Sequence, residues 1–208
     1  MWRFVLRENI RRFQAPMGHA HSEDERQTLQ RLLEEAELEL EELEEASTPD
    51  IAKRDLWLNS LAREAIDEAM ALQGAQFASL QVVDESRDHL IILAQRNLRA
   101  KFLHYLAHMK AGDGSGCGRC LAEDAPVSIS DVNNDAAFEP HLEAAIEAGF
   151  RAVRAFPVRD ASGKMIAVLS TYFDAPQSFA GDDQSRMSVL TSTLGSNLES
   201  HLATAVRP

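Results

Sequence analysis

Two pairs of short strand-like segments constrain the fold of this chain more than any other feature of its sequence. Apolar and polar residues alternate in 77–83, and the turn-forming stretch DESRD separates this segment from a second strand-like segment, HLIILAQ at 89–95. Segments 150–158 and 164–173 repeat the arrangement around the turn sequence DASG. A period of two is typical of strands, and short polar connections between strands produce antiparallel hairpins. We therefore expect two β-hairpins.

Helices are expected on both sides of these hairpins. Apolar residues at helical spacing predict one helix over 51–72 and another over 182–203. Between the hairpins, short elements are expected at 99–109 (helix), 126–130 (strand) and 140–148 (helix, with Pro140 at its start). Parallel βαβ repeats are absent from the pattern, which argues against dinucleotide-binding and thioredoxin folds. The predicted class is α+β, a central antiparallel sheet flanked by helices, and its long irregular middle is typical of a binding segment or lid.

The first 48 residues follow a different pattern. Residues 1–14 form a basic amphipathic segment, whereas residues 23–45 contain eleven acidic residues against Arg26 and Arg31, a net charge of −9. In the acidic segment, apolar residues recur at heptad spacing: Leu29, Leu33, Ala36, Leu40 and Leu43. We expect an N-terminal helical hairpin of opposite charges that supports a coiled-coil dimer. The predicted domains are residues 1–48 and 49–208.

Composition limits the function classes. The net charge of −12 disfavours binding to nucleic acid phosphates. No apolar run reaches the roughly 18–20 residues that cross a bilayer, and Arg3 and Arg7 interrupt the segment where a secretory signal would lie. Two cysteines cannot form a disulfide framework. We expect a cytoplasmic protein with reduced thiols.

The only two cysteines stand in GDGSGCGRC, residues 112–120. In the structural interpretation, Ser115 caps a short helix and Cys117 and Cys120 are core residues. A second interpretation is a thiol sensor, because a cysteine near a helix N-terminus has a lowered pKa. A third is a metal site, in which His104 and His108, spaced i and i+4, join the two cysteines. The glycines do not form a phosphate cradle, because no Lys-Ser/Thr pair follows them.

Four blocks carry a family resemblance: GAQFASLQVVDE, GDGSGCGRCLAEDAPVSISDVNNDAAFEP, GFRAVRAFPVRDASGKMIAVLSTYF and FAGDDQSRMSVLTSTLGSNLES. Over about residues 56–200 the chain resembles a GAF domain, in particular those of bacterial sensor kinases. The resemblance implies terminal helices on one face of the sheet, an unidentified small-molecule ligand in a pocket on the other, and a homodimer through the terminal helices. No kinase, cyclase or DNA-binding segment is recognisable, so we expect a non-catalytic sensor that signals to a separate protein.

Candidate pocket residues come from the irregular middle and the strand after it: Cys117, Cys120, Asp131, Phe138, His141 and Arg154. Asp131 is expected to cap the loop backbone, with ligand contact second. His141 is either a ligand contact or an exposed loop residue. Arg154 is either a pocket arginine or part of the polar face of an edge strand.

An enzymatic alternative follows from the same resemblance. Some similar GAF proteins reduce free methionine-(R)-sulfoxide with a cysteine in the loop before the last hairpin. The corresponding stretch of this chain, AFEPHLEAAIEAGFRAV, contains no cysteine. The activity is therefore not expected, since thiol catalysis needs its nucleophile at that place.

Overall fold

The computed structural model describes residues 10, 14, 23–44, 49–84, 86–179 and 182–203. It divides into two compact units, Met1–Ser60 and Leu61–Pro208. None of the described helices combines the length and apolar character that crossing a bilayer requires.

The first unit contains the acidic helix α2, Glu23–Glu44, and the start of α3, Pro49–Gln73. Leu29 and Ala36, two positions of the predicted heptad, are buried. The predicted basic helix over 1–14 lies outside the described residues, apart from positions 10 and 14, which are helical. The division into domains at residues 48 and 49 stays a prediction.

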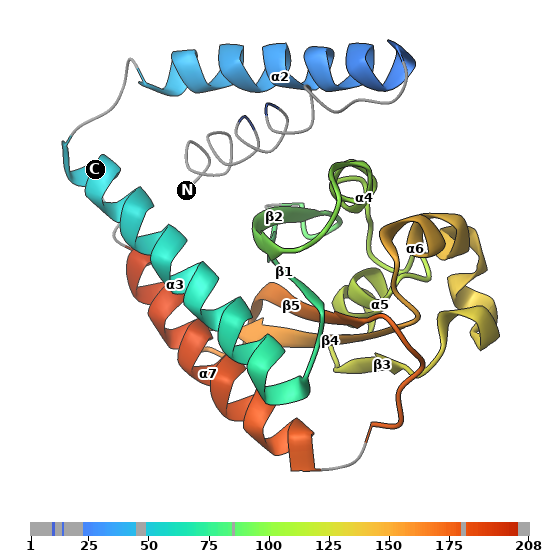
Figure 1. The fold of residues 1–208 in the computed structure, drawn as a ribbon. Coiled ribbons are helices and arrows are strands. Elements are labelled where there is room, and N and C mark those ends of the chain that lie inside the picture. The colour runs from blue at the N-terminus through green and yellow to red at the C-terminus, as the bar shows by residue number, and fades with distance from the viewer. Residues whose placement is uncertain are drawn as a thin grey trace. The chain divides into compact units, whose positions relative to one another are not determined.

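The second unit is built on a five-stranded antiparallel sheet with the order β2-β1-β5-β4-β3 (Figure 1). The strands are β1 Phe77–Val83, β2 Leu90–Arg96, β3 Val127–Ile129, β4 Ala152–Arg159 and β5 Met165–Phe173. The predicted hairpins are confirmed, since β1 pairs with β2 and β4 pairs with β5. The first hairpin joins the second through β1 and β5, and β3 adds an edge strand beside β4.

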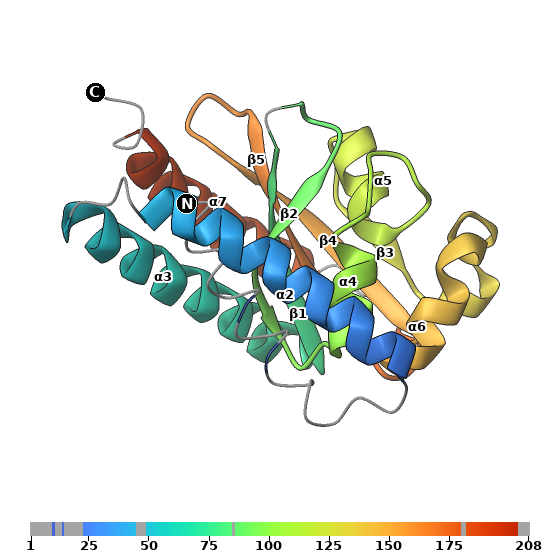
Figure 2. The ribbon, with the colours of Figure 1, turned by 90° about the horizontal axis from the view of Figure 1, so that it is seen from above.

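Long helices cover one face of the sheet, which we call the outer face. Helix α7, Asp182–Ala203, and residues 61–73 of α3 lie side by side there (Figures 1 and 2). The α7 backbone approaches β4 very closely, because a Cβ atom added at Gly195 would stand 1.8 Å from the Arg159 carbonyl oxygen. Only glycine allows this contact, so a single residue sets the depth to which α7 packs.

Short segments cover the other face, which we call the inner face. They are α4 Ala100–Leu106, α5 Gly116–Glu123, η1 Val132–Asn134, η2 Ala136–His141 and α6 Leu142–Ala148. Figure 1 shows α4, α5 and α6 on the side of the sheet away from α7. Together these segments form the predicted irregular middle, and we call them the lid.

Two lid helices differ from their predicted bounds. Helix α4 ends at Leu106 rather than near 109, because Lys110 bridges back to His89 and the Ala111 N–H donates to Asp88. Helix α6 begins at Leu142 rather than at Pro140, because Pro140 lies in the preceding 3₁₀ turn. In both places contacts with neighbouring segments set the helix end, and helical periodicity does not report those contacts.

Candidate functional site

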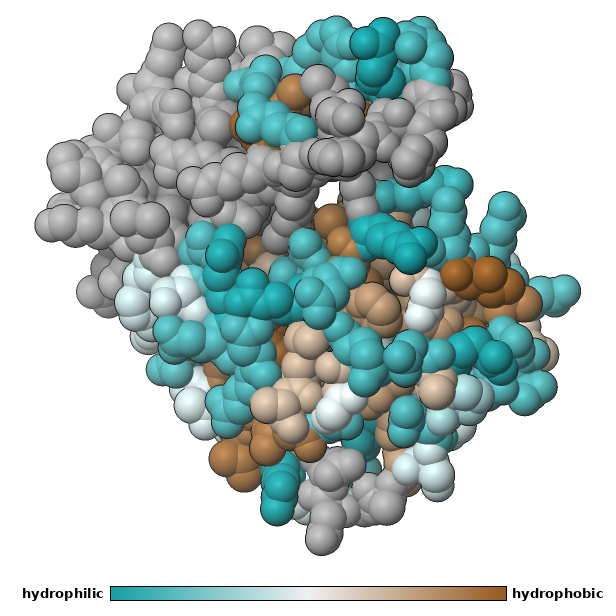
Figure 3. Space-filling model, viewed as in Figure 1, coloured by the Kyte–Doolittle hydropathy of each residue, from teal (hydrophilic) through white to brown (hydrophobic). Residues whose placement is uncertain are grey.

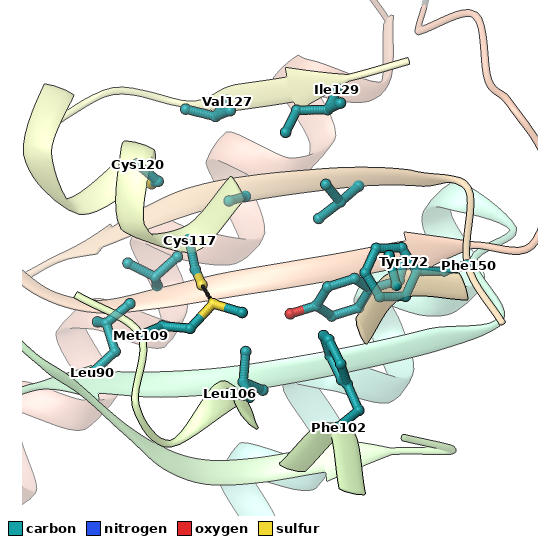
Figure 4. Close-up of a cluster of buried hydrophobic side chains, with 14 of the residues drawn as sticks. Leu90, Phe102, Leu106, Met109, Cys117, Cys120, Val127, Ile129, Phe150 and Tyr172 are labelled. Atoms are coloured by element: carbon teal, nitrogen blue, oxygen red, sulfur yellow. Dashed lines mark hydrogen bonds between the residues drawn. The ribbon is translucent and has the colours of Figure 1, made fainter. Parts of the chain in front are cut away.

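Side chains from the lid and the sheet meet in one buried cluster, which we call the inner cluster (Figure 4). Its buried members are Leu90, Ile92, Leu98, Phe102, Leu103, Leu106, Met109, Cys117, Cys120, Leu121, Val127, Ile129, Val132, Phe138, Ala145, Ala148, Phe150, Val153, Ala155, Met165, Val168 and Tyr172. Three aromatic rings form its centre: Phe150 lies 4.9 Å from Tyr172 and 5.2 Å from Phe102, between ring centroids. The face predicted to hold a small molecule is thus packed with side chains in this conformation.

Cys117 enters the cluster from the first turn of α5. The Ser115 hydroxyl accepts a hydrogen bond from the Gly118 N–H at 3.0 Å, so the predicted cap is confirmed. The Cys117 sulfur then lies 3.4 Å from the Met109 sulfur (Figure 4). A Cβ atom at Gly116 would stand 3.2 Å from the Val153 side chain, so α5 packs directly on β4.

Burial determines the acidity of both thiols. It raises the pKa of Cys117 to about 11, although the hydrogen bonds with Ser115 and the Gly118 N–H act in the opposite direction. Burial also raises the pKa of Cys120 well above its usual range. The lowered thiol pKa expected at a helix start is therefore wrong for this site, because desolvation of the thiolate outweighs the favourable N–H groups. At neutral pH both cysteines are thiols.

The strands contribute polar side chains to the inner face. The Tyr172 and Ser79 hydroxyls are 3.1 Å apart, and both residues are buried. Ser170 is paired with Ser79 across the two central strands, and Gln81 follows two residues after Ser79 on β1. All four belong to the floor of the inner cluster, and sequence reasoning missed them. The available signal was Ser79 and Gln81 at alternate positions of FASLQVV, otherwise an apolar strand.

His141 connects three parts of the lid. Its Nδ1 atom lies 2.6 Å from the Tyr105 hydroxyl on α4, and its Nε2 atom lies 2.7 Å from the Asp113 carbonyl oxygen. The Phe138 ring packs against the imidazole at 5.4 Å between centroids. His141 is only 7% exposed, so the interpretation of an exposed loop histidine is wrong. Phe138 is buried at the same place, as expected for a core or pocket-wall residue.

Asp131 and Arg154 lie apart from these residues. Asp131 accepts a hydrogen bond from the Asn133 N–H and pairs with Arg151 at 2.9 Å, which confirms its capping role. Arg154 leaves β4 on the outer face, since its cross-strand partner Thr171 donates to Gln73 of α3. β4 lies between β5 and β3, so it is not an edge strand. The predicted grouping of Arg154 with Cys117 is therefore not what the structure has.

Arg154 has aromatic surroundings instead. Its guanidinium carbon lies 4.8 Å from the ring centroids of both Phe156 and Phe179, and its Nε atom donates to the Ser128 hydroxyl. Cation–π contacts and the hydrogen bond compensate for its burial.

The described residues do not form the cluster of ligands that the metal interpretation requires. Among them, no three histidine, cysteine, aspartate or glutamate side chains come together as a metal-binding group. His108 is exposed, whereas Cys117 and Cys120 are buried. The Cys117 sulfur has a thioether and a hydroxyl as its neighbours.

The fold is similar to several solved structures. A GAF domain from a Coxiella burnetii phosphoenolpyruvate-protein phosphotransferase is 13% identical, with 99% of each chain covered and a TM-score of 0.59. The photoproduct state of GAF3 from Slr1393 of Synechocystis is 13% identical over 73% of this chain and 99% of that chain, with a TM-score of 0.57. Free methionine-R-sulfoxide reductase from Neisseria meningitidis, in complex with its substrate, is 21% identical over 71% of this chain and 81% of that chain, with a TM-score of 0.55.

At these identities the structural matches show a common fold alone. The comparison with curated proteins found no match. The model of the GAF domain family, in contrast, matches residues 57–199, which include the whole sheet, the lid and most of α7. The chain therefore belongs to the GAF domain family.

Proposed function

We propose that this protein is a non-catalytic sensory module that binds a small molecule between its lid and its sheet. The observation that carries the proposal is the inner cluster, where short lid segments cover a floor that retains polar side chains. Binding would stabilise a conformation in which the lid has moved away from the central rings, as ligands shift populations between states.

Strand β4 supplies a route for the signal. On its inner side Val153 contacts Gly116 of α5, and on its outer side the Arg159 backbone contacts Gly195 of α7. Because glycine stands at both contacts, no flexible side chain separates the helices from the strand. A ligand that displaces α5 would therefore shift β4 against α7.

We further propose that α7 and α3 form a homodimer and pass the shift to a separate protein. Val189 on α7 is 69% exposed, although valine is usually buried. The space-filling view in Figure 3 shows hydrophilic residues interspersed with small hydrophobic patches on the face drawn. The cytoplasmic location stays a prediction.

Neither the thiol-sensor interpretation nor the reductase interpretation is favoured. Both cysteines are buried, and burial disfavours the thiolate that attacks an oxidant or a sulfoxide. The similarity to the Neisseria reductase extends to the fold. We therefore expect no reduction of free methionine-(R)-sulfoxide by the purified chain.

Native mass spectrometry of protein purified from its host, together with thermal unfolding against a metabolite panel, tests the proposal. We expect a dimer mass, and either a retained small molecule or a ligand-dependent increase in Tm. A ligand at 100 times its Kd contributes about 2.7 kcal/mol, or roughly 5–10 °C for a chain of this length. A monomer with no added mass and no thermal response to any compound would contradict the proposal.

A matched variant separates the dimer from the ligand. Val189→Glu places a charge on the exposed face of α7, remote from the inner cluster. We expect it to give a monomer that still responds to the ligand. If the variant remains dimeric, the α7 interface is wrong, whereas the ligand proposal is unaffected.

A further inference from the structure

Gln81 is the polar residue on the sheet floor whose burial is hardest to explain by folding alone. It is 0% exposed. Neither its Nε2 atom nor its Oε1 atom has a hydrogen-bond partner among the residues that the structure describes. Buried amides nearly always have partners, because an unpaired donor or acceptor keeps the full cost of its desolvation.

The strand register places this amide on the inner face. Cross-strand neighbours share a face, and Gln81 is paired with Val168 on β5 and with Ile92 on β2. Both neighbours are members of the inner cluster. Ser79, two residues earlier on the same face, carries the hydroxyl beside Tyr172. The amide is thus part of the proposed ligand-binding floor.

The surroundings of Gln81 restrict the chemistry of a ligand. Among the buried residues that the structure describes, Arg154 alone carries a permanent charge, and it leaves β4 on the outer face, so the inner face offers none to a ligand. An ion buried there would have no counter-charge, which is strongly unfavourable. Val168 and Ile92, the cross-strand neighbours of Gln81, offer apolar surface to the body of a ligand. A carboxamide presents one acceptor and one donor side by side, so its complement is an adjacent N–H and C=O.

We propose that Gln81 recognises the cyclic-amide edge of a small uncharged ligand, such as a lactam, cyclic imide or cyclic urea. This inference rests on the proposed function and adds the ligand class to it. The amide of Gln81 pairs with the N–H and C=O of the ligand, and the apolar side chains beside Gln81 cover the apolar body of the ligand. In the ligand-free protein the same amide lowers stability, since an apolar side chain would fit this floor without the desolvation cost.

Matched neutral and charged probes test the ligand class. Uracil is compared with orotate, and 2-pyrrolidone with pyroglutamate, so that each pair differs chiefly by a carboxylate. Binding to the full-length protein is measured by saturation-transfer NMR and by Tm at millimolar probe concentrations. We expect at least one neutral probe to bind, and its charged partner to bind at least 10-fold more weakly.

Two variants test the role of the residue. Gln81→Met keeps the side-chain length without the amide, and Gln81→Leu replaces it if the methionine variant does not fold. We expect a ligand-free Tm equal to or above that of the wild type, and at least a 10-fold loss of affinity for the neutral probe. Gln73→Leu, on the outer face, is the control, and we expect it to lower Tm while leaving probe affinity unchanged.

Three outcomes would overturn the inference. They are equal binding of neutral and charged probes, unchanged affinity in Gln81→Met, and a lower ligand-free Tm in both Gln81 variants, which would mean that the amide is paired within the fold. If the protein retains a host ligand but binds neither neutral probe, this inference fails and the proposed function stands. If it shows neither a retained ligand nor any thermal response, both fail.

Discussion

The two faces of the sheet are built from alternate residues of the same strands, yet they differ in what they bury. The outer face carries small and branched apolar side chains, such as Ala78, Leu80, Ala167 and Leu169, each 0% exposed. The inner face of the same two strands carries Ser79, Gln81, Ser170 and Tyr172. The outer face also buries Thr171 and Arg154, but Thr171 donates to Gln73 and Arg154 donates to Ser128, whereas the Gln81 amide on the inner face has no partner among the described residues.

The largest effect should come from the outer face. Gly195→Val places side-chain atoms where the Arg159 carbonyl already stands, 1.8 Å from a Cβ atom. Helix α7 must then move off β4, and we expect a loss of more than about 4 kcal/mol, against which the gain in helix propensity from glycine to valine, less than about 0.5 kcal/mol, is small. Urea unfolding measures the loss. Ser196→Val, one residue on and exposed, should change stability by less than about 0.5 kcal/mol.

The lid should slow the reaction of Cys117 with thiol reagents, because it covers this side chain on the inner face. Burial raises the pKa of Cys117 from an ordinary thiol value of 9.0 to about 11, which lowers its thiolate fraction about 100-fold at pH 8. In a Cys120→Ala background, the reaction of Cys117 with a thiol-specific disulfide reagent should therefore be at least 100-fold slower in buffer than in concentrated urea. Equal rates in the two solvents would show that the lid does not protect this side chain.

A smaller effect is expected within the lid. Tyr105→Phe removes the hydroxyl that lies 2.6 Å from His141 Nδ1. One hydrogen bond of this kind contributes about 1 kcal/mol, and the imidazole nitrogen left without it is mostly buried. We expect a loss of about 1 kcal/mol in urea unfolding, together with faster reaction of Cys117 if the hydrogen bond holds the lid closed. If the variant loses stability but Cys117 reacts no faster, the Tyr105 hydroxyl stabilises the fold without holding the lid closed.

The smallest effect should come from the edge of the outer face. Arg96 donates two hydrogen bonds of 2.6 Å to Asp67 on α3 and lowers the pKa of that carboxyl. A lowered pKa contributes stability above the unfolded value of about 3.9, and that contribution is lost as pH falls through the folded value. Because the pair is largely exposed, Asp67→Asn should cost less than about 1 kcal/mol at pH 7.

The pH dependence distinguishes this pair from a packing contact. The difference in unfolding free energy between wild type and Asp67→Asn should be constant from pH 6 to pH 8 and should shrink below about pH 4. An undiminished difference at pH 3 would mean that the substitution acts through packing of α3 rather than through the carboxylate charge.

Periodicity predicted the fold where an element faces one environment along its whole length. Strand β1 and helix α7 have the bounds expected from the sequence, 77–83 and 182–203. The lid was predicted less well, because its elements are one or two turns long. Their ends depend on a bridge between His89 and Lys110 and on a 3₁₀ turn through Pro140. Neither contact produces a periodic pattern in the sequence, so periodicity could not predict these helix ends.

The candidate site was predicted in part. Cys117, Phe138 and His141 were singled out because they lie in the irregular middle that the sequence predicted as a binding segment or lid. Arg154 was not assigned to a face, since β4 is buried on both sides and burial does not alternate along it. Gln81 and Tyr172 were overlooked for the opposite reason, because each lies within a strand that reads as ordinary core. A polar residue within such a strand is the signal to look for.

The position of His141 has a consequence for the kinetics of the lid. Because one imidazole joins α4 and the loop before α5 to the segment that leads into α6, none of the three can move far without breaking a shared hydrogen bond. Backbone amides in these segments should therefore exchange their hydrogens with deuterium at similar rates, as one cooperative unit. Entry of a guest molecule would then require a single concerted opening, so the protein would respond in one step rather than by gradual loosening.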